Sequence, residues 1–501
     1  MRSCALPLVL AVFLMAVLPT PAVAGLFDDA VSGSLDSDAP PVQGEGSDTP
    51  PDASPPGETA ARVESQPAEK TDESTFGFEL NGFVRADVFL GKVYGQDDAE
   101  VKNGYGEAAL KLTVRKRPHA MAYADGRLRY GYEDGGQELH LELKEAWVDL
   151  YLGPFDIRMG QQIIVWGRAD SVNPTSNLVA LNATVRSDDL DDKRMGNLGL
   201  KVSGNWQPVR LEAVWMPLYR ANTLPRLPFP DTDTLAVTLK DAFPSASLRN
   251  SLGAARLHVE LPAVEFSFSY LFGYSPTPGI VLDDIDFGQE RTVINLTRRA
   301  YRHHVAGFDF SLPVKDWFGL RGEAAYKHPF EDTRQPAVAR PDLQWVLGLD
   351  RQWGEFYLIG QYVGRYVWQW EAETGGTLLD QAGVAPTPPL PEAVQALMEA
   401  SVTSAAARTT QLIFGQAARW QHSAWLRMEY KLLQETLTLE ATGSVNFTTW
   451  EWMVRPRIAY NVADAVTLAF GGEVFMGPDD SFNGLIDQMV SAGYMEVKVS
   501  F

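Results

Sequence analysis

The chain has 501 residues, of which 45% are hydrophobic and 21% are charged, and its formal net charge is −21. This apolar content excludes a collagen-like or wholly disordered chain, and the acidic balance argues against a nucleic-acid-binding protein, which needs a basic surface. The single cysteine, Cys4, excludes internal disulfides and cysteine-ligated metal sites, so we expect neither a cofactor nor a metal.

Residues 1–24 have the pattern of a secretory signal peptide. Arg2 supplies the positive start, residues 6–18 are apolar, and Ala22-Val23-Ala24 matches a cleavage site. The alternative, a retained membrane anchor, is disfavoured because the apolar run is short for a bilayer. We therefore predict export from the cytoplasm by the general secretion route.

Residues 25–75 are predicted to be a disordered linker. The segment is rich in Asp, Glu and Pro, and only Arg62 and Lys70 oppose its acidic residues. Too little apolar surface is present to offset the entropy of ordering such a chain. The linker either serves as a plain spacer or tethers the protein to a periplasmic partner.

From Phe76 onward, apolar and polar residues alternate with a period of two, which indicates β-strands. One such run alternates the apolar residues Leu426, Met428, Tyr430 and Leu432 with the polar residues Arg427, Glu429 and Lys431. The strands are about 10 to 15 residues long, whereas strands in soluble proteins average about five or six. Tight turns alternate with long loops, as in outer-membrane proteins. Residues 76–501 are therefore predicted to form an all-β, transmembrane, antiparallel up-and-down β-barrel.

The turn pattern predicts the number of strands. Eight tight turns and nine loops join 18 strands, and 16 is the fallback because residues 409–421 are ambiguous. An even number places both ends of the barrel on the periplasmic side. Tryptophans near the strand ends are predicted to form interfacial girdles; they are Trp166, Trp206, Trp215, Trp317, Trp353, Trp368, Trp370, Trp450 and Trp452.

The fourth predicted strand changes phase. Leu139, Leu141 and Leu143 share one face, whereas Ala146 and Val148 have the other parity. A β-bulge near residues 144–145 would keep all of them facing lipid. The bulge either aims a charge into the pore or is a purely local irregularity.

The polar strand faces carry nearly equal numbers of basic and acidic residues, so we predict a lumen of mixed charge rather than one built for anions. Most of these charges are expected to pair across strands. The candidates for the lumen wall are Arg85, Asp87, Lys111, Arg127, Arg129, Arg158, Arg427, Glu429, Arg455 and Arg457.

The loop at residues 169–194 is the best candidate for a constriction. It follows the strand that ends at Trp166-Gly167 and is dense in charge. Folded into the lumen, it would narrow the pore and set a transverse field. The alternatives are a solvated outer loop, or an acidic cluster that binds Ca²⁺ or contacts lipopolysaccharide through divalent ions. The candidate constriction residues are Arg168, Asp170, Arg186, Asp188, Asp189, Asp191, Asp192 and Arg194.

The longest loop, residues 371–410, contains a predicted helix. Pro391 suits the first turn, and residues 392–407 are Ala-rich with apolar residues at helical spacing. The helix either lies in the mouth as a partial plug or packs on other loops as a cap.

Two segments resemble known outer-membrane proteins. Residues 160–168, Gly-Gln-Gln-Ile-Ile-Val-Trp-Gly-Arg, followed by Val172-Asn173-Pro174, resemble a recurring motif of an uncharacterised proteobacterial outer-membrane barrel family, a domain of unknown function. The run at residues 430–478 is similar to the same family. This resemblance implies a porin-like barrel that moves hydrophobic or unidentified solutes. The final strand ending in Phe501 resembles the signal that the barrel-assembly machinery recognises.

We therefore predict an outer-membrane channel or transporter for small or amphiphilic solutes. The alternatives are a structural or adhesive barrel and, less favoured, a hydrolase. Catalysis needs a nucleophile with a base, or paired acids, at one place, and the seven histidines fall in no such motif. The expected partners are outer-membrane lipid and lipopolysaccharide, and the oligomeric state is left open.

Overall fold

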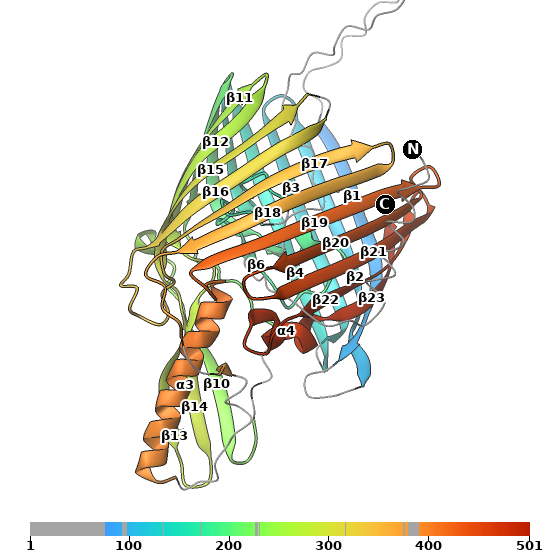
Figure 1. Ribbon diagram of the computed structural model, residues 1–501. Helices are drawn as coiled ribbons and strands as arrows, with labels where there is room; N and C mark the ends of the chain where they lie inside the picture. Colours follow the sequence, from blue (N-terminus) through green and yellow to red (C-terminus); the bar gives the residue numbers. More distant parts are fainter. Residues whose placement is uncertain are drawn as a thin grey trace, which may run out of the picture.

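The computed structural model describes residues 76–92, 98–133, 135–170, 172–225, 229, 231–315, 317–373, 376–378 and 390–501 (Figure 1). The predicted signal peptide and linker lie outside the described residues. Within them, one sheet of eighteen strands forms the body of the molecule. Its strands are β1 (Phe76–Lys92), β2 (Ala99–Lys116), β3 (Ala120–Glu133), β4 (Gly136–Leu152), β5 (Phe155–Gln162), β8 (Asn197–Trp206), β9 (Val209–Met216), β11 (Leu252–Leu261), β12 (Val264–Tyr274), β15 (Arg302–Val314), β16 (Phe318–Pro329), β17 (Asp342–Trp353), β18 (Phe356–Val367), β19 (Trp420–Leu432), β20 (Leu437–Asn446), β21 (Glu451–Ala463), β22 (Val466–Met476) and β23 (Ala492–Ser500).

The sheet closes into a barrel. Each strand pairs antiparallel with the next one in the sheet, and β1 pairs with β23 from Phe83↔Ser500 to Leu90↔Gly493. Closure leaves no unpaired sheet edge, which a hydrocarbon environment requires. The predicted antiparallel barrel of 18 strands is confirmed. The eight tight turns lie at the rim where the chain ends, and the long loops lie at the opposite rim (Figure 1).

The two faces of the wall differ as the alternation predicts. On β19, Leu426 points outward and is 42% exposed, whereas the neighbouring Arg427 points into the lumen and is 7% exposed. Exposed leucine, valine and phenylalanine side chains recur around the outside of the barrel. So large an apolar surface is stable only against lipid. Among the described helices, none is long and apolar enough to cross a membrane.

Aromatic residues mark both rims. Trp206, Trp317 and Trp353 are exposed near the tight turns, and Trp368 and Trp450 are exposed at the loop rim. Two of the predicted girdle residues lie elsewhere. Trp166 is 2% exposed and lies in the lumen, because the chain turns inward after β5. Trp370 lies beyond the end of β18, where its indole N–H donates to the carbonyl of Gln416.

The predicted bulge on β4 is present. Asp125 pairs with Glu145 and Gly126 pairs with Leu143, so Lys144 is the extra residue. Leu141, Leu143 and Val148 are consequently all exposed on the lipid face. The bulge thus resolves the phase change in the sequence, and Lys144 itself is 4% exposed on the lumen side.

A small cap projects from the loop rim (Figure 1). It consists of a three-stranded sheet, β10 (Leu235–Ala242), β14 (Thr292–Arg299) and β13 (Gly279–Phe287), together with helix α3 (Glu392–Ile413). The helix begins at the predicted residue and extends six residues beyond residue 407. Residues 220–249 and 275–299 are two of the long connections between barrel strands, and they contain β10, β13 and β14. Their apolar residues pack against α3, which is distant in sequence.

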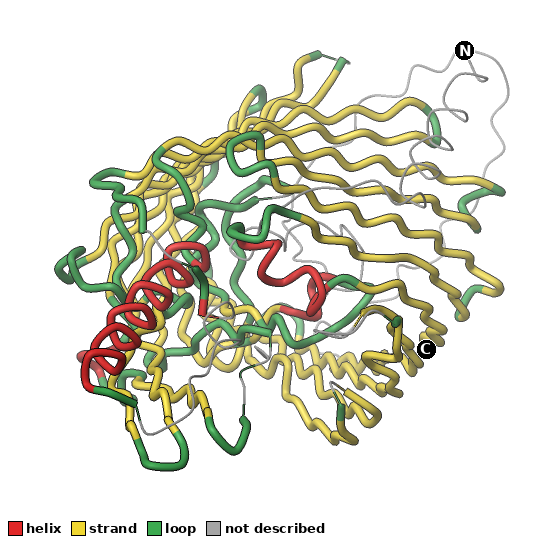
Figure 2. Tube along the Cα trace, turned by 60° about the horizontal axis from the view of Figure 1, so that its bottom comes forward, coloured by secondary structure: helices red, strands yellow, loops and turns green. Residues whose placement is uncertain are grey.

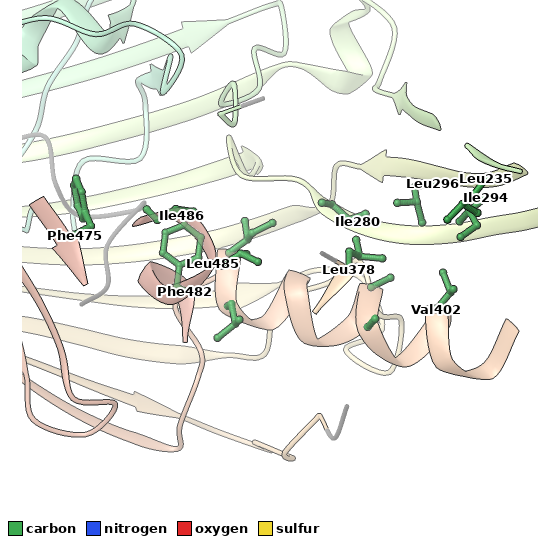
Figure 3. Close-up of a cluster of buried hydrophobic side chains, with 14 of the residues drawn as sticks. Leu235, Ile280, Ile294, Leu296, Leu378, Val402, Phe475, Phe482, Leu485 and Ile486 are labelled. Carbon is green, nitrogen blue, oxygen red and sulfur yellow. The ribbon is translucent and has the colours of Figure 1, made fainter. Parts of the chain in front are cut away.

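The cap has its own hydrophobic core (Figure 3). Leu235, Ile280 and Leu296 from the sheet pack against Val402 of α3. The same cluster continues into helix α4 (Phe482–Val490) through Phe482, Leu485 and Ile486. Helix α3 is therefore part of a cap packed on other loops, and α4 lies across the mouth of the barrel (Figure 2).

Candidate functional site

The chain between β5 and β8, residues 163–196, enters the barrel, and we call it the lumen segment. It contains two short strands, β6 (Ala180–Leu181) and β7 (Arg194–Met195), and a 3₁₀ turn, η1 (Leu190–Lys193). Ile164, Trp166 and Leu178 are buried in a cluster with wall residues of β9, β11, β12, β15 and β16. The sequence alternative of a solvated outer loop does not fit this burial.

Glu323 on β16 holds the first turn of the lumen segment. Its carboxylate accepts hydrogen bonds from the backbone N–H groups of Ala169 at 3.1 Å and Thr175 at 3.0 Å, and from the Thr175 hydroxyl. Gly167 has φ +100°, and a Cβ there would lie 2.3 Å from the Glu323 carboxylate. Only glycine fits this conformation and this close approach.

Charged residues on either side of this turn extend the first anchor. The Arg168 guanidinium donates to Asp309 on β15 at 3.0 Å and also pairs with Glu265 on β12. Asp170 accepts from Arg321 on β16 at 3.0 Å. Arg168 of the quoted sequence motif and its neighbours Ala169, Asp170 and Thr175 thus fasten the lumen segment to the wall at β12, β15 and β16.

Asp188 forms a second anchor on a different part of the wall. Its carboxylate accepts from Arg457 on β21 at 2.8 Å and from the Tyr494 hydroxyl on β23 at 2.5 Å. The Asp188 carbonyl also accepts from Arg455. Asp188 is 7% exposed, so these charges face one another largely out of water.

Asp192 forms a third anchor, close to the seam between β1 and β23. It lies 2.7 Å from the Arg85 guanidinium of β1 and also pairs with Arg127 of β3. Arg85 in turn donates to Glu107 of β2 at 2.9 Å. The lumen segment therefore spans the barrel interior from β12–β16 to β1–β3 and β21–β23.

Lys144, the extra residue of the bulge on β4, also contacts the backbone at this third anchor. Its ammonium group donates to the carbonyls of Asp191 at 3.1 Å and Asp192 at 2.6 Å. Of the two interpretations of the bulge, the correct one is that it points a charge, the Lys144 ammonium group, into the barrel. The four aspartates of residues 188–192 do not converge on one point, because Asp188 and Asp192 are taken up by arginines of different strands. This arrangement does not support the Ca²⁺ alternative.

The electrostatics of these anchors predict how they respond to acid. Burial raises the pKa of Asp188, but Arg457, Arg455 and the Tyr494 hydroxyl together outweigh this effect and hold the pKa below the ordinary value of 3.8. Burial is likewise outweighed by Arg85 and Arg127 at Asp192, whose pKa lies well below 3.8. A carboxylate with a depressed pKa stabilises the folded state above its unfolded pKa and loses that contribution as the pH falls through its folded pKa.

We therefore expect hydrogen exchange of residues 186–194 to stay equally slow, once corrected for the intrinsic effect of pH, from pH 8 to pH 5. Both anchors should weaken only when the pH falls below 3.8, the ordinary pKa of an aspartate. Hydrogen-exchange mass spectrometry of the folded protein measures this directly. Loosening of the segment between pH 7 and pH 5 would contradict the assignment of Asp188 and Asp192 as ionised anchors.

The remaining predicted constriction residues lie on the lumen segment with different partners. Arg186 donates to the carbonyl of Val490 at 2.8 Å, and Asp189 accepts from the N–H of Asp191 as the cap of η1. Arg194 pairs with Asp191 at 2.8 Å.

The remaining wall candidates all face inward, but the structure does not bring them to one place. Arg129 pairs with Glu107, and Asp87 lies 3.4 Å from Arg85. Arg158 pairs with Asp149, and Arg427 pairs with Glu429 at 3.2 Å. Lys111 lies over the ring of Phe83. Several of these charges thus pair with neighbours in the wall, as predicted for a lumen of mixed charge.

Sequence reasoning did not single out several residues as anchors, although it placed most of them on polar strand faces or at the bulge; they are Glu107, Lys144, Glu265, Asp309, Glu323 and Tyr494. They stand on polar strand faces like many other residues, and the alternation alone does not distinguish an anchor from an ordinary wall residue. The phase change at Lys144 was the one local signal. Glu323 has no such signal, because its partners are backbone groups about 150 residues away in the chain.

The comparisons with known proteins find likeness in fold. No protein-family model and no curated protein sequence matches the chain. Among solved structures, the chain is similar to OccK5 (OpdH) of Pseudomonas aeruginosa, with a TM-score of 0.45 and 10% identity over 84% of this chain and 97% of that one. It is also similar to OccAB3 of Acinetobacter baumannii, with a TM-score of 0.48 and 8% identity over 85% and 99% of the two chains.

A BenF-like porin from Pseudomonas fluorescens gives a TM-score of 0.47 and 11% identity over 85% of this chain and 98% of that chain. The last of these neighbours is a porin by name. The function below is argued from the residues of this barrel alone.

Proposed function

We propose that this protein is an outer-membrane channel for small polar or amphiphilic solutes, and that the lumen segment sets its narrowest section. The observation that carries the proposal is the attachment of residues 163–196 to well-separated parts of the wall through Glu323, Asp188 and Asp192. A purely structural barrel has no evident need for a segment held across its interior by buried ion pairs, since each such pair carries a desolvation cost.

The charges in the lumen are mixed, so the proposed selectivity comes from their arrangement rather than from net charge. Arg85, Arg127 and Arg457 converge where the lumen segment presents Asp188 and Asp192. Opposed charges in a narrow section create a transverse field that favours solutes with a large dipole moment, because such solutes can align with the field.

The topology in the cell belongs to the same proposal. The rim with the tight turns would face the periplasm and the cap would face outward among the lipopolysaccharide. Phe501 would be recognised by the barrel-assembly machinery, and residues 25–75 would extend into the periplasm, where they would act as a spacer or bind a partner.

Single-channel recording of the purified protein in planar lipid bilayers tests the proposal. We expect discrete conductance steps that persist in the absence of any other protein. A correctly folded barrel that gives no conductance would overturn the channel assignment and favour a structural or adhesive role.

Neutralising Asp188 tests the role of the charges. Asp188→Asn removes the carboxylate that Arg457 faces, so the freed guanidinium should lower the cation-to-anion permeability ratio, by roughly twofold or more. Asp189→Asn is the matched control. It makes the same chemical change one residue away, at a side chain that caps η1. Reversal potentials in a salt gradient measure both. Equal shifts in the two variants would contradict a specific role for Asp188.

An adhesive role has one observation in its favour, which is the cap that projects beyond the mouth (Figure 1). Leu397 on α3 is 71% exposed there. Leu397→Glu should leave conductance unchanged under the channel proposal. A loss of cell-surface attachment without a change in conductance would favour adhesion.

A further inference from the structure

The C-terminal end of helix α4 lines a cavity of about 300 Å³ at the mouth of the barrel. The cavity lies between the lumen segment, near Val185 and Ser187, the wall at Phe89 and Tyr494, and the end of α4 at Met489. Figure 2 shows α4 in the mouth, viewed from the cap side. The end of α4 is therefore one wall of this cavity, opposite the lumen segment.

The C-terminal end of α4 is held by two cations instead of by its own chain. A helix leaves its last four carbonyls without helical partners. In α4 the Asp487 carbonyl accepts from the N–H of Ser491, and Lys102 and Arg186 take up the other three. Positive charge at this end also interacts favourably with the helix dipole.

The two cations come from different parts of the molecule. Lys102 stands on β2 of the wall and donates to the carbonyls of Gln488, Met489 and Ser491. Arg186 stands on the lumen segment and donates to Met489 and Val490. The Met489 carbonyl is shared between them. One helix end thus joins the wall to the segment that crosses the lumen.

Arg186 is itself fixed to the rest of the lumen segment. Its own carbonyl accepts from the Tyr105 hydroxyl of β2, and two residues later Asp188 makes its anchor with Arg457. The other end of α4 depends on a conventional cap, the Ser481 hydroxyl, which accepts from the N–H of Gly484 at 3.2 Å.

We propose that α4 is a lid over the mouth cavity, that Lys102 and Arg186 are its latch, and that opening the lid loosens the lumen segment. The outer mouth and the inner constriction then open together. The proposal concerns regulation of the channel and therefore rests on the proposed function. Its test, however, measures the opening of α4 itself and does not require a conductance measurement.

Hydrogen-exchange mass spectrometry of the full folded chain in detergent provides that test. In Lys102→Met, we expect the amides of residues 482–490 to exchange roughly tenfold faster or more, because hydrogen bonds from a charged donor are lost. We expect residues 183–193 to speed up as well, although the substitution lies on β2. Lys240→Met, on the cap sheet, is the control and should change neither peptide.

A second variant keeps the test informative even if Lys102→Met misfolds. Ser481→Ala removes the N-terminal cap of α4, far from the latch, and should give the same joint acceleration of residues 482–490 and 183–193. Lys102→Arg should keep both peptides slow. If either loosening variant accelerates α4 while residues 183–193 stay unchanged, the coupling is disproved. If Lys102→Met leaves α4 itself unchanged, the latch is disproved.

Failure of the latch and failure of the channel are distinguishable. Absence of conductance in the wild-type protein would overturn the proposed function, whatever the exchange rates. Conductance in the wild-type protein with independent exchange of the two peptides would retain the channel and remove the lid.

Discussion

Replacing residues 163–196 by a two-residue Asn-Gly turn should raise the single-channel conductance severalfold. Gln162 at the end of β5 and Asn197 at the start of β8 are direct partners in the sheet, so a tight hairpin turn joins them without moving either strand. The substitution removes all three anchors at once and leaves Arg85, Arg457 and Glu323 facing water in a wider lumen. Conductance follows the narrowest open section, which is why this change is expected to exceed that of any single substitution.

The matched control shortens a different outer connection. Replacing residues 288–291, between the paired residues Phe287 and Thr292 of β13 and β14, by the same Asn-Gly turn changes only the cap and should leave conductance unaltered. Both variants should retain heat-modifiable migration, which reports a folded barrel. Unchanged conductance after loss of residues 163–196 would place the narrowest section at α4 and the cap instead.

A carboxylate on the outer face of β19 should prevent assembly, whereas a carboxylate on the lumen face of the neighbouring strand β20 should be tolerated. Leu426 is paired with Gly443 and faces lipid, and Thr442 is paired with Arg427 on the lumen side. A charge at the bilayer midplane costs about 2–4 kcal/mol for Arg or Lys and less for Asp. Thr442→Asp instead places its charge beside the Arg427 guanidinium.

Thr442→Asp tests the lumen face better than a substitution of Arg427 itself would. Arg427 lies 3.2 Å from Glu429 and 3.0 Å from Glu440, so its loss would strand two carboxylates. The folded fraction after refolding into lipid vesicles, read from heat-modifiable migration, measures both aspartate variants. A folded Leu426→Asp barrel together with an unfolded Thr442→Asp barrel would invert the assignment of the two faces.

Local chemistry determined the barrel. A side-chain period of two with one apolar face is sufficient to define strands that separate lipid from lumen, and Pro and Gly at the turns set the connections. The same local rule located the bulge at Lys144, because only an extra residue keeps Leu143 and Val148 on one face. Pro391 marked the start of α3 because its fixed φ suits a first turn and its missing N–H has no helical acceptor there.

Tertiary structure decided what the charged residues do. Asp188 and Asp189 are chemically identical neighbours, yet one faces Arg457 and the other caps η1, and only the path of the chain through the lumen separates them. Trp166 matched an interfacial girdle by its place near a strand end, and it is buried because the chain turns inward after β5 ends at Gln162. The cap sheet needed α3, more than 90 residues away in the chain, to cover its apolar residues. Contacts of this kind depend on distances in space that alternation along a single strand does not encode.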